Sequence, residues 1–185
     1  MSYKAPIDEQ ALVRQLQDPK TAHSAFGTLL QFYSEPVYWQ VRRMVLNHED
    51  ANDIVQNVFL KAWTNLQKFR GEAKLSTWLF KIATNESINF INKERNRLQS
   101  VSDTGDDSFL IKNLEADTHF DGDALQLELQ NAIAKLPEKQ RLVFNMRYYE
   151  EMKYEEMSEV LGTSVGALKA SYHHAVKKIS EMLLS

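Results

Sequence analysis

The chain has 185 residues, a formal net charge of -3, 43% hydrophobic residues and no cysteine. This length allows one large domain or two small ones, and the apolar content is ordinary for a globular protein. The lack of cysteine excludes disulfide bonds and thiolate metal sites, which suits a cytoplasmic protein. Since there is no long apolar run and no secretory start, neither membrane insertion nor export is expected.

Charge is spread unevenly along the chain. Residues 1–97 carry 13 lysines and arginines against 10 acidic residues, residues 98–123 carry one against seven, and residues 124–185 carry eight of each. The middle segment is also rich in Asp, Ser, Thr and Gly and lacks helical periodicity. The sequence therefore predicts a first domain over 1–97, an acidic flexible linker over 98–123 and a second domain over 124–185.

Apolar residues at three- and four-residue steps predict helices throughout the first domain, and no alternating strand pattern competes with them. A short helix is expected to end at Asp18–Pro19, and a longer one should follow from about residue 24 and include Pro36. Residues 47–50 should form a turn, with Asp50 capping the next helix. The polar side of that helix carries Asp53, Gln56, Asn57 and Lys61.

A further helix is expected after the charged turn RGEAK, with Ser76 or Thr77 capping its free N–H groups. One exposed track here combines amides, lysines and aromatic rings, which can stack on unpaired bases, read their edges and hold their phosphates. Aromatic residues at helical spacing more often pack in a core, so spacing favours a core position for Trp63 and leaves two others open. The candidate single-strand site comprises Phe69, Lys74, Thr77, Trp78, Lys81, Asn85 and Asn89.

The second domain contains a helix-turn-helix pattern. Gly162 provides a tight turn after a short helix, Thr163 or Ser164 caps the next one, and apolar residues such as Leu168 should pack back. The outward residues near the start of the second helix are small or hydrogen-bonding, as expected where a helix end enters a major groove. The candidate duplex-contacting residues are Ser164, Val165, Gly166, Ala167, Lys169, Ala170, Ser171, His173, His174 and Lys177.

Both halves carry motifs of one family. The stretches DIVQNVFLKAW, FRG and LSTWLFKIATNESINF resemble conserved region 2 of bacterial RNA polymerase sigma factors, and the segment that begins LPEKQRLVFNMRYY resembles region 4. The short chain is similar to the extracytoplasmic-function (ECF) group. The resemblance implies an all-α fold of two small domains, a region 2 helix bundle and a region 4 helix-turn-helix.

The resemblance also implies a function. The protein would bind core RNA polymerase, at the beta-prime clamp and the beta flap, and would direct promoter recognition, promoter melting and transcription initiation. The clamp would be held by Asp53, Gln56, Asn57, Leu60 and Lys61. The first domain would capture an unpaired base of the minus-ten element, the second would bind the minus-thirty-five duplex, and the linker would thread through the polymerase cleft. An inhibitory anti-sigma factor is common in this family.

Two departures from the family pattern bear on these expectations. Gln56-Asn57 stands where many relatives have Gln-Glu, which puts one polymerase contact in question. The recognition helix has Ser171, His174 and Val176 where relatives carry arginines, which implies weaker or differently directed phosphate binding.

Other function classes find less support in the sequence. No phosphate-binding loop, dinucleotide fingerprint, zinc-protease motif or cysteine nucleophile is present, so no enzyme activity, cofactor or metal is expected. Two alternatives stay open. One is a stand-alone helix-turn-helix regulator that binds duplex DNA, and the other is a helical module that binds only proteins.

Overall fold

The computed structural model describes residues 8–99, 108–115 and 124–184, and all the regular structure in these ranges is helical. The predicted all-α fold is therefore confirmed. The elements are α1 (Glu9–Gln17), α2 (Ala22–Val45), α3 (His48–Asn65), the 3-10 turn η1 (Leu66–Lys68), α4 (Leu75–Gln99), α5 (Ser108–Glu115), α6 (Ala124–Ala134), α7 (Glu138–Tyr148), α8 (Tyr154–Leu161) and α9 (Val165–Leu183). Among the described residues, no helix is both long and apolar enough to cross a membrane.

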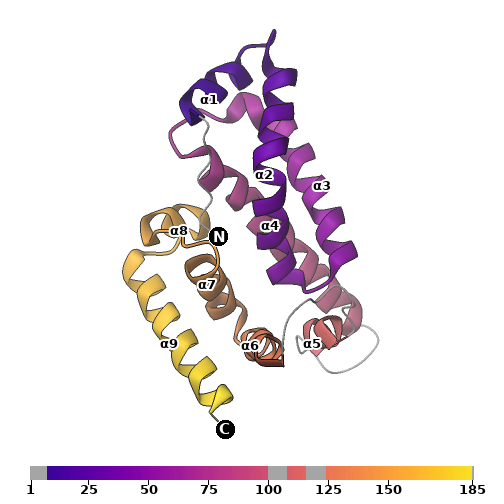
Figure 1. Ribbon diagram of the computed structural model, residues 1–185, viewed down its shortest axis with the longest axis vertical. Coiled ribbons are helices and arrows are strands. Elements are labelled where there is room, and N and C mark those ends of the chain that lie inside the picture. Colours follow the sequence, from indigo (N-terminus) through magenta and orange to yellow (C-terminus); the bar gives the residue numbers. More distant parts are fainter. Residues whose placement is uncertain (1–7, 100–107, 116–123, 185) are drawn as a thin grey trace.

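The first half is a bundle of α2, α3 and α4, with α1 lying at one end (Figure 1). Its core is continuous and includes Leu29, Val41, Val58 and Leu79, all fully buried. Burying such a side chain contributes about 1.5–3 kcal/mol. α2 continues through Pro36 as one helix and therefore spans the whole bundle.

Two helix starts differ from the sequence-based expectation. α3 begins at His48, because the side chain of Asn47 accepts a hydrogen bond from the backbone N–H of Asp50 at 3.0 Å. The expected turn over 47–50 is therefore wrong, and Asp50 lies inside the first helical turn. An acidic residue there interacts favourably with the helix dipole.

The start of α4 is capped from a distant part of the chain. The carboxylate of Glu9, on α1, accepts hydrogen bonds from the backbone N–H groups of Leu75 and Ser76, the latter at 3.3 Å. Neither Ser76 nor Thr77 provides the expected cap. Because helix starts leave N–H groups without partners, this contact fixes α1 against α4.

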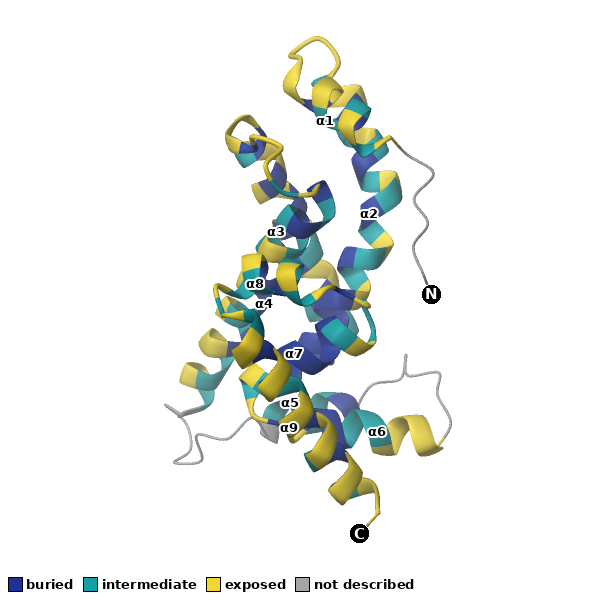
Figure 2. Ribbon diagram, turned by 90° about the vertical axis from the view of Figure 1, so that its left-hand side faces the viewer, coloured by how far each residue is buried: buried dark blue, intermediate teal, exposed yellow. Residues whose placement is uncertain are grey.

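The second half is assembled around α7. Six consecutive residues of α7, from Arg141 to Met146, are buried, and Figure 2 shows this helix as a dark band through the middle of the molecule. Leu142 packs into the core of the first half, Phe144 packs beneath α9, and Met146 packs with α8. A helix that is buried all round must be enclosed by neighbours, so the two halves share α7 as a common layer.

The acidic segment between the halves contains a helix that the sequence analysis did not predict. Leu110 and Leu114 of α5 are buried together with Leu46, from the end of α2, and Ala134 of α6. Asn113 also donates a hydrogen bond to the carbonyl of Val45 at 3.3 Å. The expectation of an irregular linker is therefore wrong for residues 108–115, whereas 100–107 and 116–123 lie outside the described residues.

Ion pairs reinforce the contact between the halves. Arg43 pairs with Glu150, and its guanidinium lies 4.4 Å from the ring centre of Tyr149. Arg95 of α4 pairs with Glu138 of α7 at 2.9 Å, and α4 also contacts α8. The second half thus lies directly against α2 and α4.

Candidate polymerase and nucleic-acid interfaces

One face of α3 is free of packing and polar along most of its length. Asp53, Gln56 and Asn57 are exposed, and Leu60 is 63% exposed one turn further on. The opposite stripe of α3 is buried in the bundle, which leaves this face for an external partner. Four of the five residues expected to hold the polymerase therefore share one surface.

The fifth residue, Lys61, is turned toward α4. Its Nζ lies 2.6 Å from Oε1 of Glu86, so it bridges the two helices and belongs to the hollow described next.

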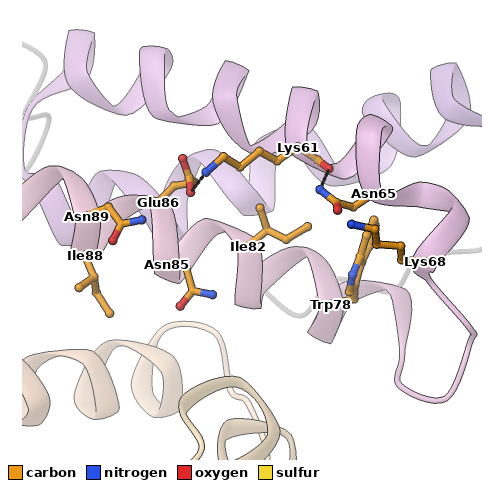
Figure 3. Close-up of a pocket in the computed structure, with 9 residues that line it drawn as sticks. All are labelled: Lys61, Asn65, Lys68, Trp78, Ile82, Asn85, Glu86, Ile88 and Asn89. Atoms are coloured by element: carbon orange, nitrogen blue, oxygen red, sulfur yellow. Dashed lines mark hydrogen bonds and ion pairs between the residues drawn. The ribbon is translucent and has the colours of Figure 1, made fainter.

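A hollow of about 580 Å³ lies between α3 and α4 (Figure 3). Trp78 and Lys68 lie toward one end of it, and Asn89 lies toward the other. The residues that line the hollow are Lys61, Asn65, Lys68, Trp78, Ile82, Asn85, Glu86, Ile88 and Asn89. The aromatic ring, the amides and the lysines of this set can stack on a base, read its edge and bind a phosphate.

Buried contacts behind α4 fix the direction in which the lining residues project. Gln40 on α2 donates hydrogen bonds to the hydroxyl of Thr84 at 2.9 Å and to the carbonyl of Phe80 at 3.2 Å. Since Thr84 is buried, the helix period places Lys81 and Asn85 on the exposed side. The site is therefore held by a rigid buried layer.

The predicted single-strand residues do not all lie on the exposed track. Thr77 and Phe69 are each 5% exposed, so their expected surface positions are wrong. Phe69 packs behind Trp78, with ring centres 4.9 Å apart, and therefore supports the wall of the hollow from within. Lys81, Asn85 and Asn89 are exposed as expected, and Trp78 is half-buried.

Trp63 also departs from its predicted position. It was assigned to the core by spacing, yet it is 40% exposed. Its ring meets Phe26 edge-on, with ring centres 5.0 Å apart, and His23 edge-on, with ring centres 6.1 Å apart, so two rings hold it at the surface.

Lys74 joins the first half to the second. Its ammonium pairs with the carboxylate of Glu156 on α8. The hydrogen bond with Glu156 raises the pKa of Lys74 above its ordinary value, and the negative charge of the same carboxylate adds to the effect. A lysine expected to meet DNA is thus neutralised by the second half in this arrangement.

Five residues of the hollow were missed by the sequence analysis: Asn65, Lys68, Ile82, Glu86 and Ile88. The four-residue step from Trp78 to Ile82 and on to Glu86 places these three on adjacent turns, which was a usable signal. Asn65 and Lys68 come from α3 and η1, and their convergence with α4 depends on tertiary packing.

The helix-turn-helix of the second half forms as predicted. Gly162 ends α8 with a φ of 61°, a left-handed conformation that glycine adopts without strain. Ser164 caps α9 by accepting from the N–H of Ala167 at 3.4 Å. Met157 and Leu168 are fully buried between the two helices, so the pair packs through a small apolar core.

The outer face of α9 exposes small and basic residues (Figure 2). Exposed residues from the predicted set are Ser164, Gly166, Ala167, Lys169, Ala170, His173, His174 and Lys177, whereas Val165 and Ser171 are partly covered. The Nζ of Lys169 lies 5.7 Å from the ring centre of Tyr154, and Lys177 lies 3.9 Å from Glu181. The face is therefore narrow and weakly basic.

Comparison with known proteins agrees with this two-part construction. The Sigma-70 region 2 family model matches residues 29–97, and the Sigma-70 region 4 family model matches residues 126–179. The first match covers α3, most of α4 and the hollow, and the second covers α7, α8 and most of α9.

Relatives and solved structures extend over nearly the whole chain. The chain is 32% identical to the ECF RNA polymerase sigma factor SigW of Bacillus subtilis over 174 residues, which are 90% of this chain and 93% of SigW. It is 29% identical to the ECF RNA polymerase sigma-E factor of Escherichia coli K12, over 94% of this chain and 93% of that protein. The structure of CnrH in complex with the cytosolic domain of CnrY has a similar fold, with a TM-score of 0.69 at 23% identity over 95% of this chain and 96% of that one.

A second structure of similar fold is the sigma factor RpoE of Bartonella quintana in complex with the anti-sigma factor NepR, with a TM-score of 0.67 at 21% identity. It covers 85% of this chain and 96% of that chain. The chain belongs to the ECF RNA polymerase sigma factors. It therefore binds core RNA polymerase and directs promoter recognition, melting and transcription initiation, which rules out both the stand-alone regulator and the pure interaction module.

Proposed function

We propose that three surfaces of this sigma factor each bind a different partner, and that the polymerase alone carries out the chemistry. The exposed face of α3 holds the beta-prime clamp. The hollow between α3 and α4 captures an unpaired base of the minus-ten element. The outer face of α9 enters the major groove of the minus-thirty-five element, and the second half also meets the beta flap.

The observation that carries this proposal is the composition of the hollow. A half-buried indole, three asparagines and two lysines line a space of about 580 Å³ on a protein that must open DNA. Base–aromatic stacking contributes about 1–3 kcal/mol per base, and amides can bond to base edges. Duplex DNA cannot present a base in this way, so the hollow fits a strand that is already unpaired.

The exposed face of α3 suits a protein partner. Asp53 supplies charge at one end and Leu60 supplies apolar area one turn before the end, with two amides between them. Interfaces commonly combine a small apolar centre with a polar rim. The clamp contact uses Asp53, Gln56, Asn57 and Leu60, and Lys61 turns to the hollow.

Family membership supports the remaining assignments of the proposal. Residues 1–97 and 124–185 act as the two binding domains, with 98–123 connecting them through the polymerase cleft. The protein works in the cytoplasm and needs no cofactor. An anti-sigma factor restrains it, and a partner of this class is bound in the complex of RpoE with the anti-sigma factor NepR.

A charge reversal on α3 tests the proposal. Asp53→Lys should weaken binding to core polymerase by about tenfold or more, because the exposed negative charge of a polar face is replaced by a positive charge. Its free energy of unfolding should stay within about 0.5 kcal/mol of the wild type, as for most surface changes. Glu35→Lys, an exposed reversal on α2 outside the three assigned surfaces, is the matched control and should bind core normally. If Asp53→Lys binds as tightly as this control, the clamp lies elsewhere.

A further inference from the structure

One carboxylate lies in the hollow, and none of the assigned contacts uses it. Glu86 on α4 faces Lys61 across the gap between α3 and α4 (Figure 3). Its side chain is 15% exposed, whereas that of Lys61 is 53% exposed. An anionic group beside a strand of phosphates is repulsive, so the presence of Glu86 needs a reason beyond attraction of DNA.

A purely structural reason is weak. The Lys61–Glu86 pair spans α3 and α4 and could act as a brace. Ion pairs with one well-exposed partner contribute only about 0.2–1 kcal/mol, however, and α3 and α4 already share a continuous buried core. The bundle does not depend on this pair.

We propose that Glu86 is a specificity-determining residue, and that the hollow selects a base with an exocyclic amino group over thymine. This inference rests on the proposed capture of an unpaired base in the same hollow. An ionised carboxylate can only accept hydrogen bonds. Cytosine, adenine and guanine each offer an amino group to it, whereas thymine presents two carbonyl oxygens on either side of a single N–H.

The neighbouring side chains complete the recognition. Asn85 and Asn89 line the same hollow, and their amides can donate to a ring nitrogen or carbonyl next to the amino group. Trp78 supplies a ring face on which the base can stack. Together with Glu86 they can bond to an exocyclic amino group and to the ring nitrogen or carbonyl next to it.

Lys61 has the complementary task. A lysine on a flexible stem can exchange one anionic partner for another, so its ammonium can move from Glu86 to a phosphate when the strand enters. That movement frees the carboxylate for the base. With thymine in the hollow, a mostly buried carboxylate would lose its lysine and would face a single ring N–H between two carbonyl oxygens, which repel it. A site built to bond an amino group rejects an analogue that lacks it.

The test uses the full chain assembled with core RNA polymerase and a pool of bubble templates whose unpaired non-template strand is randomised. Bound templates are recovered and sequenced. The wild type should deplete thymine at one position by about tenfold, the scale of one specific base contact. Glu86→Gln, which can still accept from Lys61, should abolish the depletion at that position and keep every other preference.

Two further variants make the result specific. Glu94→Gln is the matched control, because Glu94 lies on the same helix, pairs with Arg97 at 2.7 Å and does not line the hollow. It should keep the depletion of thymine. Lys61→Gln should bind the whole pool more weakly and still disfavour thymine, because it removes the phosphate partner and leaves the carboxylate.

The outcomes separate this inference from the function on which it rests. Glu86→Gln could deplete thymine as strongly as the wild type while Asn85→Ala loses the sequence preference at that position. In that case Glu86 does not read the base, but base capture in the hollow is still supported. If Glu86→Gln weakens all preferences equally, it is only a brace, which also overturns the inference. If the wild type and Asn85→Ala enrich the same templates, both the role of Glu86 and base capture in the hollow are overturned.

Discussion

The hollow between α3 and α4 and the outer face of α9 are built in opposite ways for the same polymer. The hollow is concave, and one of its two lysines, Lys61, is paired with its one carboxylate, Glu86. The face of α9 is convex, exposes Gly166 and Ala170, and holds Lys169 over a tyrosine ring. An unpaired base exposes its ring and its edge, so a concave site can bind both. A duplex exposes base edges only in its grooves, so a protruding helix can bind them.

The two regions also differ in their support. α4 rests on one continuous core that spans the first half. α9 rests on two small clusters, one of which includes Phe80 from α4 as a packing neighbour. The position of the recognition helix α9 therefore depends on a few buried side chains and on contact with the first half. The position of α4 depends on a larger core.

The largest expected effect comes from the small core beneath α9. Leu168→Ala removes a fully buried side chain and should lower the free energy of unfolding of the second half by about 2–5 kcal/mol. Urea unfolding followed by circular dichroism measures this, and duplex binding should fall in parallel. Val176→Ala, on the exposed side of the same helix, should change little. Equal stability of the two variants would contradict the account of α9.

A negative charge added to the outer face of α9 should weaken the binding of duplex DNA alone. Ala170→Glu places a carboxylate where phosphates are expected, and a pair of like charges 4 Å apart costs about 1 kcal/mol even in water. Affinity for a duplex promoter fragment should fall and affinity for a bubble template should not. Ala170→Gln controls for side-chain size. Comparable losses on both templates would erase the proposed distinction between the two regions.

The smallest effect concerns two ion pairs between the halves, which should respond to pH in opposite directions. Burial raises the pKa of Glu150 above its ordinary value, although Arg43 opposes the shift. Burial would also raise the pKa of Glu156, but the hydrogen bonds from Lys74 and from the Lys153 N–H outweigh it and lower that pKa. The Lys74 pair is partly exposed, so its contribution is about 0.2–1 kcal/mol.

The signs follow from proton binding. Above about pH 4.3, the ordinary glutamate value, Glu156 stabilises the folded state, and this contribution is lost as the pH falls through its lowered pKa. Glu150 binds its proton more tightly when folded, so its contribution is largest at low pH and declines as the pH rises through its raised pKa. Glu156→Gln should therefore converge with the wild type on acidification, and Glu150→Gln should gain on the wild type from pH 4 to 7. If the free energy of unfolding depends on pH in the same way in all three proteins, the opposite pH responses of the two ion pairs are refuted.

Most helices could be predicted because helical periodicity is a local property. Gly162 and Ser164 marked the turn and the cap of the helix-turn-helix, and both occupy those positions. The apolar stripe of α3 likewise fixed which side faces outward, and Asp53 is exposed accordingly. These features need no knowledge of what the helix packs against.

The features that were missed depend on distant partners. α5 is short, and Leu110 is buried only because the end of α2 and α6 lie on either side of it. The cap of α4 comes from Glu9, and the partner of Glu86 comes from α3. Spacing favours a core position for Trp63 and leaves Phe69 open, yet tertiary packing exposes the first and buries the second.

Promoter opening by Asn85→Ala tests base capture in the hollow most directly. The variant should bind core normally, and its holoenzyme should bind duplex promoter DNA normally. Promoter opening, followed by the fluorescence of 2-aminopurine in the minus-ten element, should become less favourable by about 1–3 kcal/mol, the value of one specific base contact. Asn96→Ala, an exposed asparagine of the same helix outside the hollow, should open like the wild type. Wild-type opening by Asn85→Ala would contradict capture of the base between α3 and α4.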